Sequence, residues 1–213
     1  MTPKAYVESL TLLGFQNVFN PYSNRCPIYD LDDAPKRRQE MLLSMLEVAV
    51  ATDVDSIWVG RDLGYRGGRR TGLALTDECH LFDHTNRWGV TAARSTTGVP
   101  FGERTAKVIW SALTDIRVPI FLWNVFPFHP HHPQEQLTNR PHGPRERQIG
   151  EDLLVELIRS INPRRLVGLG NDAAAVLARV RGNREAVQLR HPSYGGQKTF
   201  LRQVLLLYQT RFT

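Results

Sequence analysis

Cysteine is scarce in this chain of 213 residues, and so are other signatures of common protein classes. Only Cys26 and Cys79 occur, without a paired-cysteine spacing, which excludes a disulfide framework, a zinc ribbon and an iron–sulfur cluster. No run of about 18 apolar residues is present for a membrane span, and the first residues are too polar for a signal peptide. We therefore expect a cytoplasmic protein that uses no metal or other cofactor and contacts no membrane.

Positive charge is in excess of negative charge. The chain has 27 Lys and Arg against 21 Asp and Glu, a net charge of +6, and an isoelectric point near 9.7. This balance suits a polyanionic partner such as DNA, although it does not require one. With 41% hydrophobic residues and no Pro/Gly/Ser-rich linker, residues 1–213 are expected to form one domain, and the protein is expected to be a monomer.

Helical and strand patterns alternate along the chain. Short apolar segments typical of buried strands lie at 56–60, 118–125, 165–171 and 186–190. Segments with helical apolar spacing lie at 3–13, 35–51, 103–114, 144–161, 171–181 and 198–210. Strands separated by helices indicate a mostly parallel sheet that is covered on both faces. We predict an α/β fold, a three-layer α/β/α sandwich with about four strands, in which the Pro- and His-rich segment 126–144 is an extended loop.

Polar residues follow several of the predicted strands. Asp62 lies just after the first strand, Asn124 at the end of the second, and His191 after the fourth. Because the carboxyl ends of parallel strands meet at one edge of a sheet, a ligand site is expected there. Structural explanations stay open at this stage: Asp62 could hold a turn, and Asn124 could cap a neighbouring backbone group.

A glycine-rich loop, "GRDLGYRGGRRTGLALTDE" at 60–78, surrounds Asp62 with four arginines. It lacks the Gly-Lys-Ser/Thr ending of a phosphate-binding P-loop, and no helical pattern begins at once as a dinucleotide fold would need. It is either a phosphate-binding segment or a solvated basic turn.

Four segments in this order resemble the uracil-DNA glycosylase superfamily. "VGRDLG" (59–64) is similar to the first motif, a strand running into Gly-x-Asp, and "FLWNVFPFHP" (121–130) is similar to the apolar strand that ends in Asn. "HPSY" (191–194) matches the last motif, His-Pro-Ser, and "TGVPFGE" (97–103) looks like the segment with the base-stacking phenylalanine in the single-strand-selective monofunctional branch. The resemblance spans roughly 56–210, so the predicted helical segment 1–55 lies outside it.

The resemblance implies a monofunctional uracil-DNA glycosylase, which flips uracil out of DNA, hydrolyses the N-glycosidic bond and releases free uracil, leaving an abasic site for base excision repair. Asp62 would stabilise positive charge on the sugar and orient or deprotonate water, while His191 would donate a hydrogen bond to uracil O2. Phe101 would stack on the base, and Asn124 would read its edge. The other predicted uracil-binding residues are Gly60, Arg61, Gly64 and Tyr65.

The DNA backbone is expected to contact basic and glycine-containing segments around this pocket. Arginines would bind phosphates, a helix N-terminus would offer free N–H groups, and glycines would allow close approach of the backbone. The predicted DNA-binding residues are Arg66, Arg69, Arg70, Gly170, Asn171, Ser193, Tyr194, Gly195, Gly196, Gln197 and Lys198.

Two other interpretations stay open. Four histidines could form a metal site, but their spacing between prolines, without a carboxylate cluster, is more typical of a polar loop; they are His129, His131, His132 and His142. Alternatively, the chain is a catalytically weak or inactive glycosylase-fold module that binds uracil-containing or single-stranded DNA.

Overall fold

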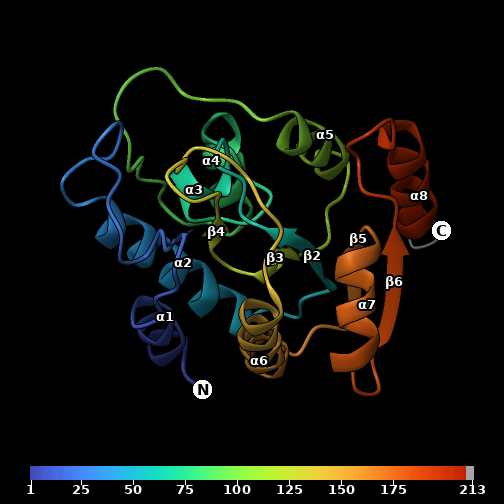
Figure 1. Ribbon diagram of the computed structural model, residues 1–213. Coiled ribbons are helices and arrows are strands. Elements are labelled where there is room, and N and C mark those ends of the chain that lie inside the picture. Colours follow the sequence, from blue (N-terminus) through green and yellow to red (C-terminus); the bar gives the residue numbers. More distant parts are fainter. Residues whose placement is uncertain (210–213) are drawn as a thin grey trace.

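A four-stranded parallel sheet forms the centre of the protein (Figure 1). The computed structural model describes residues 1–209. The strand order is β3-β2-β5-β6, and every neighbouring pair is parallel. A separate antiparallel pair joins β1 to β4. The strands are β1 (Val18–Phe19), β2 (Ser56–Asp62), β3 (Ile120–Phe126), β4 (His129–Pro130), β5 (Arg165–Leu169) and β6 (Glu185–Leu189).

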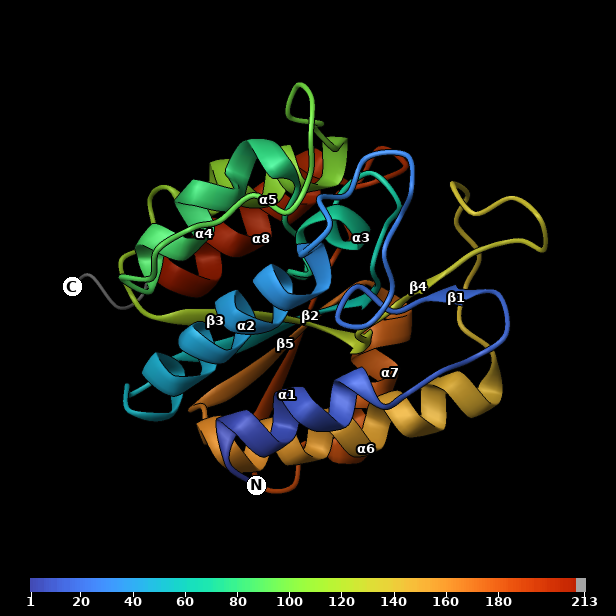
Figure 2. The ribbon, with the colours of Figure 1, turned by 90° about the vertical axis from the view of Figure 1, so that its left-hand side faces the viewer.

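The long helices cover both faces of this sheet. One hydrophobic cluster receives side chains from α1 (Pro3–Thr11), α2 (Ala34–Val50), α6 (Pro144–Ile161) and α7 (Asn171–Val180). The other receives them from α5 (Arg104–Leu113) and α8 (Gln197–Gln209). Figure 2 shows the layers, with α5 and α8 above the sheet and α1 and α6 below it. The predicted α/β/α sandwich with about four strands is confirmed.

Alternate side chains of each central strand enter opposite clusters, as the pleat of a strand requires. In β2, Val59 packs with α1, α2, α6 and α7, whereas Trp58 packs with α5 and α8. Leu122 of β3 also lies on the α5/α8 side. Gly60 and Asn124 are register partners two residues further along their strands, so both face the α5/α8 side.

Local sequence signals explain why helix α6 begins and ends as predicted. The Gly143 N–H donates to Glu146 Oε2 at 2.6 Å, and Pro144 occupies the first turn. Asn162 ends the helix in the left-handed region, with φ +50°. The last predicted helix, 198–210, corresponds to α8, but residue 210 lies outside the described residues.

Several short elements were not predicted. Between β2 and α5 the chain forms α3 (Gly68–Thr71), the 3-10 turn η1 (Glu78–His80) and α4 (Leu81–Arg87). The segment 126–144 is not a loop throughout, because it contributes β4 to the antiparallel pair. Helices of three to seven residues and strands of two residues are too short for hydrophobic periodicity to distinguish them.

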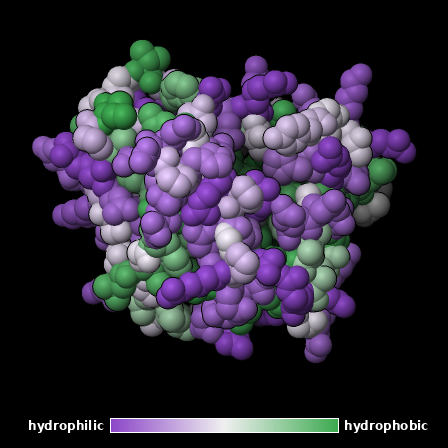
Figure 3. All heavy atoms as spheres, viewed as in Figure 1, coloured by the Kyte–Doolittle hydropathy of each residue, from purple (hydrophilic) through white to green (hydrophobic). Residues whose placement is uncertain are grey.

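The face of the protein that Figure 3 shows is largely polar. Most residues on the face in Figure 3 are hydrophilic, and the hydrophobic residues lie in separate groups. Between residues 1 and 209, no helix combines the length and the hydropathy needed to cross a membrane.

Candidate active site

A cavity of about 460 Å³ lies at the carboxyl ends of β2 and β5 and beside the loop after β6. Its lining includes Asp62, the last residue of β2, and His191 from that loop. Gly170 and Asn171, at the start of α7, also line it. The structure therefore brings together the two side chains predicted to be catalytic, at the sheet edge where parallel folds bind ligands.

The Asp62 carboxylate is held by two donors, one on each oxygen. His142 Nδ1 donates to Oδ1 at 2.5 Å, and Arg61 Nε donates to Oδ2 at 2.8 Å. Arg61 also reaches Asp172 of α7, with Nη1 at 3.2 Å from Oδ2. Charge-assisted hydrogen bonds of this kind fix the orientation of a carboxylate. Asp62 is thus positioned before any ligand enters the cavity.

Nδ1 of the His191 ring is hydrogen-bonded within the protein, whereas no described residue hydrogen-bonds to Nε2. The Ser193 N–H donates to Nδ1 at 3.2 Å, and Ser193 Oγ lies 2.7 Å from the same nitrogen. Because Nδ1 accepts, the proton of the neutral ring lies on Nε2. Burial lowers the pKa of His191, and the positive charges of Arg61 and Arg190 lower it further. His191 therefore provides a neutral ring with an Nε2–H donor.

The side-chain amide of Asn124 is buried. The residue is 1% exposed, and among residues 1–209 neither Oδ1 nor Nδ2 has a hydrogen-bond partner. A Cβ at Gly60 would lie 2.4 Å from Asn124 Oδ1 and 2.9 Å from Leu75 Cδ2, so only glycine fits beneath these side chains. Leu75 lines the cavity, but Asn124 does not. Leu75 therefore shields the amide from the cavity.

Leaving this amide unpaired has an energetic cost. A buried polar group without a partner destabilises the folded state by about 1–3 kcal/mol. Leu75 adds to the cost, since its φ of +56° is unusual for a bulky side chain. Both features therefore carry an energetic cost close to the cavity that Leu75 lines.

Phe101, Tyr65 and Arg66 lie together outside the cavity lining. The Arg66 guanidinium carbon is 5.3 Å from the centroid of the Tyr65 ring and 5.7 Å from that of Phe101. Arg66 Nε also donates to the Tyr65 hydroxyl at 2.7 Å. Phe101 is 44% exposed. The structure thus brings Phe101 to a basic and aromatic rim rather than to the wall of the cavity.

Two arginines predicted to bind phosphates require a correction. Arg69 is fully buried: Nε donates to the Tyr29 hydroxyl at 2.8 Å, and Nη1 lies 3.0 Å from His129 Nδ1. Arg70 Nε donates to Glu78 Oε2 at 2.6 Å, and its side chain is only 12% exposed. Arg69 is closed to solvent and Arg70 is paired with Glu78, so in this structure neither presents a free guanidinium for a phosphate, and both hold the loop together. Arg66, by contrast, is exposed.

The loop after β6 is exposed beside the cavity. Tyr194 is 97% exposed and has φ +49°, and Gly195 follows with φ +75°. The Gly196 N–H donates to Ser193 O at 3.0 Å, which closes the turn. Gln197 and Lys198 are exposed at the start of α8. At the other predicted helix terminus Asn171 is also exposed, and its Oδ1 accepts from Gln188 Nε2 at 2.7 Å.

Sequence reasoning missed Glu103, which also lines the cavity. A Cβ at Gly64 would lie 3.4 Å from both Glu103 carboxylate oxygens. Burial raises the pKa of Glu103 to about 7, with a further increase from Asp77 and an opposing effect from Arg66. Within residues 1–209, no group donates a hydrogen bond to this carboxylate. Gly64 and Gly67, close to Asp62 in the sequence, leave room for a side chain from another segment. They were the signal that could have indicated one.

His142 was missed as a partner of Asp62 and was considered only as a metal ligand. The histidines of this segment have other hydrogen bonds: His129 Nε2 donates to Thr138 O at 2.7 Å, and His131 Nδ1 lies 2.9 Å from His132 O. Over the described residues, no group of three or more His, Cys, Asp or Glu side chains is arranged to hold a metal. The structure thus gives the metal interpretation no support.

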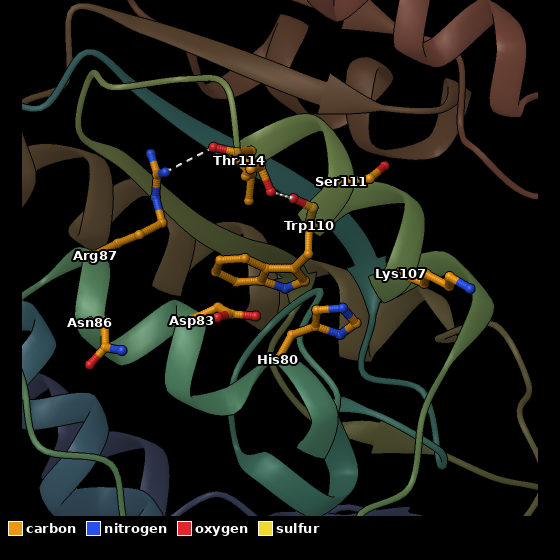
Figure 4. Close-up of a pocket in the computed structure, with 9 residues that line it drawn as sticks. His80, Asp83, Asn86, Arg87, Lys107, Trp110, Ser111 and Thr114 are labelled. Atoms are coloured by element: carbon orange, nitrogen blue, oxygen red, sulfur yellow. Dashed lines mark hydrogen bonds between the residues drawn. The ribbon is translucent and has the colours of Figure 1, made fainter.

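A larger cavity, of about 590 Å³, is lined by residues of α4 and α5 and contains none of the predicted site residues. In Figure 4 the His80 ring lies against the Trp110 indole, and their centroids are 6.1 Å apart at an interplanar angle of 11°. Arg87 Nη1 donates to Leu113 O at 3.0 Å. Arg87 is thus bound to the backbone, and none of the predicted site residues reaches this cavity, so cavity size alone does not identify the site.

Comparisons with known proteins agree with the resemblance seen in the sequence. The family model of the Uracil DNA glycosylase superfamily matches residues 89–207, which include Asn124 and His191 but not Asp62. No curated protein matches. Among solved structures, 30 chains match. One is described as "The crystal structure of WT Pedobacter heparinus SMUG2"; the TM-score is 0.65 at 14% identity, over 99% of this chain and 98% of that chain. This chain belongs to the uracil DNA glycosylase superfamily.

Proposed function

We propose that this protein is a monofunctional DNA glycosylase that excises uracil. One observation carries the proposal: Asp62 and His191 line one cavity, where Asp62 presents fixed acceptor oxygens and His191 presents an Nε2–H donor. Cleavage of an N-glycosidic bond builds positive charge on the sugar and negative charge on the departing base. An acceptor and a donor in the same cavity match these two charges.

The proposed reaction is a hydrolysis. The bond between deoxyribose C1′ and uracil N1 breaks, and its electron pair leaves with the base. Asp62 stabilises the positive sugar, and a water molecule bonds to C1′ while Asp62 accepts its proton. His191 Nε2–H donates to O2 of the uracil anion, which takes a proton from solvent after release. His142 and Arg61 each occupy one lone pair of a carboxylate oxygen, so other lone pairs remain for the water.

The base must leave the DNA stack to reach this cavity, at a cost of a few kcal/mol. Tyr194, on the exposed loop beside the cavity, is the side chain that we assign to contact the DNA where the base has left. Arg66 and Lys198 are exposed cations for phosphates. Once Leu75 moves aside, the Asn124 amide would pair with the base edge.

The test is incubation of the protein with labelled oligonucleotides that contain a single uracil, followed by alkaline cleavage of abasic sites. We expect alkali-dependent product from uracil DNA, no strand cleavage without alkali, and the same activity in EDTA. Tight binding of uracil DNA without product would favour the alternative, a module that binds DNA and does not cleave it. Activity that EDTA abolishes and zinc restores would contradict the mechanism.

A further inference from the structure

We propose that Glu103 reads the flipped base as a neutral carboxylic acid, so that loss of its proton weakens recognition of uracil. The inference rests on the proposed function, because it concerns the same cavity. It adds a specificity-determining residue that is separate from Asp62 and His191.

The position of the Glu103 side chain is the first argument. The residue lines the cavity together with Asp62, although it belongs to the segment that begins α5. Its carboxylate occupies the space above Gly64: a Cβ there would lie 3.4 Å from both oxygens. A side chain at Gly67 would collide with it, since a Cβ would lie 2.3 Å from Oε2. Two positions without side chains thus make room for this carboxyl group at the cavity that Asp62 also lines.

The second argument is the lack of a protein partner. No described residue hydrogen-bonds to the Glu103 carboxyl group, although the residue is only partly exposed. A partner must therefore come from water or from a ligand. A protonated carboxyl can donate a hydrogen bond, and the uracil C4=O has two lone pairs, so O4 can accept from Glu103 in addition to a bond from Asn124. An ionised carboxylate can only accept, so it would repel O4.

The charges around Glu103 place this protonation change near neutral pH. Burial, the largest cause, and the nearby Asp77 raise the pKa of Glu103 to about 7, while Arg66 opposes them. Asp77 Oδ2 accepts from the Glu103 N–H at 2.6 Å, so its position is fixed. Glu103 is followed in α5 by Arg104 and Lys107. The other charged or titratable residues that line the cavity are Arg61, Asp62, Arg140, Asp172, Arg190, His191 and Tyr194.

The experiment measures base recognition without cleavage. Oligonucleotides carrying 2′-fluoro-2′-deoxyuridine, whose glycosidic bond resists hydrolysis, are compared with the same strand carrying a tetrahydrofuran abasic analogue. The ratio of the two affinities isolates the contribution of the base, and it is measured from pH 5.5 to 9 for the parent protein, Glu103→Gln and Glu103→Ala. Glu185→Gln, an exposed change on β6, is the matched control. Thermal melting confirms that each variant is folded.

We expect the uracil preference of the parent to fall by up to tenfold per pH unit above about 7, as the carboxyl ionises. Glu103→Gln keeps a donor and an acceptor at every pH, so its preference stays level and exceeds that of the parent at least about tenfold at pH 8.5. Glu103→Ala has low preference throughout, and Glu185→Gln follows the parent. ¹³C NMR of the Glu103 carboxyl carbon should show titration near neutral pH.

Other results would overturn the inference or separate it from the proposed function. If Glu103→Gln retains the pH dependence of the parent, or if the parent shows no base preference, Glu103 does not read the base. If the parent cleaves uracil DNA while all variants share its pH profile, the glycosylase function stands and this inference fails. If no cleavage occurs but the predicted affinity ratios are measured, the proposed glycosylase function fails and Glu103 remains a base-reading residue.

Discussion

Asp62 and Glu103 are two carboxyl groups in one cavity with opposite surroundings. Asp62 accepts hydrogen bonds from His142 and Arg61, one on each oxygen. Glu103 accepts none from the described residues, and its neighbour Asp77 carries the same charge. Burial without donors favours the neutral acid and raises the pKa of Glu103, whereas donors favour a carboxylate in a fixed orientation.

This difference shows how one cavity can hold two acids with different tasks. A fixed carboxylate suits charge stabilisation at the sugar, and a neutral acid suits a hydrogen bond to a carbonyl oxygen. The environment of each group, more than its residue type, therefore decides its chemistry. Substitutions that act on only one of the two groups test this division.

The largest effect is expected for Asp62→Asn. The substitution keeps the size of the side chain but removes the negative charge that would stabilise the sugar. Single-turnover cleavage of uracil DNA should fall by about 10²–10⁴-fold, the range for one positioned catalytic group. Affinity for DNA should change little. Asp32→Asn, an exposed change, is the control. A folded Asp62→Asn protein that cleaves at the parent rate would remove Asp62 from the mechanism.

A smaller effect is expected from His142, which contacts Asp62 and not the substrate. His142→Ala removes one charge-assisted hydrogen bond, worth about 1.5–3 kcal/mol, so the single-turnover rate should fall roughly 10–100-fold. His142→Asn can place an amide N–H near the position of Nδ1, and it should recover most of that loss. If the two variants are equally slow, the ring has a role other than donating to Asp62.

The Asn124 amide allows a test in which stability and recognition change in opposite directions. Leucine has nearly the same shape as asparagine, so Asn124→Leu removes two unpaired polar atoms without leaving a cavity. We expect the melting temperature to rise, and the preference for uracil over an abasic analogue to fall about tenfold. A lower melting temperature with unchanged preference would show that the amide is structural.

Much of the fold was predictable because it follows from periodicity along the chain. The four apolar segments became the four parallel strands, and the predicted helices end within two residues of the observed ones. Hydrophobic alternation reports burial on a sheet or a helix face over many residues. The β1–β4 pair gave no such signal, because two-residue strands depend on contacts between distant segments.

The site was only partly predictable. Asp62 and His191 follow strands, so the geometry of a parallel sheet was enough to bring them to one edge. His142 reaches Asp62 from a loop, 80 residues further along the chain, and Glu103 reaches the cavity from the start of a helix, 41 residues further along. No local pattern encodes such approaches. The burial of Arg69 was hidden for the same reason: its partners Tyr29 and His129 are remote in sequence.

The smallest predicted effect comes from Arg66, which acts on Glu103 but not on Asp62. Its positive charge opposes the increase in the pKa of Glu103, so Arg66→Ala should let that pKa rise further. The loss of uracil preference would then begin at a higher pH, by on the order of half a unit, since Arg66 is exposed and solvent screens its charge. Affinity for uracil and abasic strands should fall alike through a lost phosphate contact, so the ratio of affinities removes this contribution. Added salt should reduce the difference in this pH between Arg66→Ala and the parent. Arg25, which pairs with Asp32, provides the control: Arg25→Ala should leave the ratio of affinities unchanged at every pH. If the loss of uracil preference begins at a lower pH in Arg66→Ala than in the parent, Glu103 is not the group whose ionisation sets the preference for uracil.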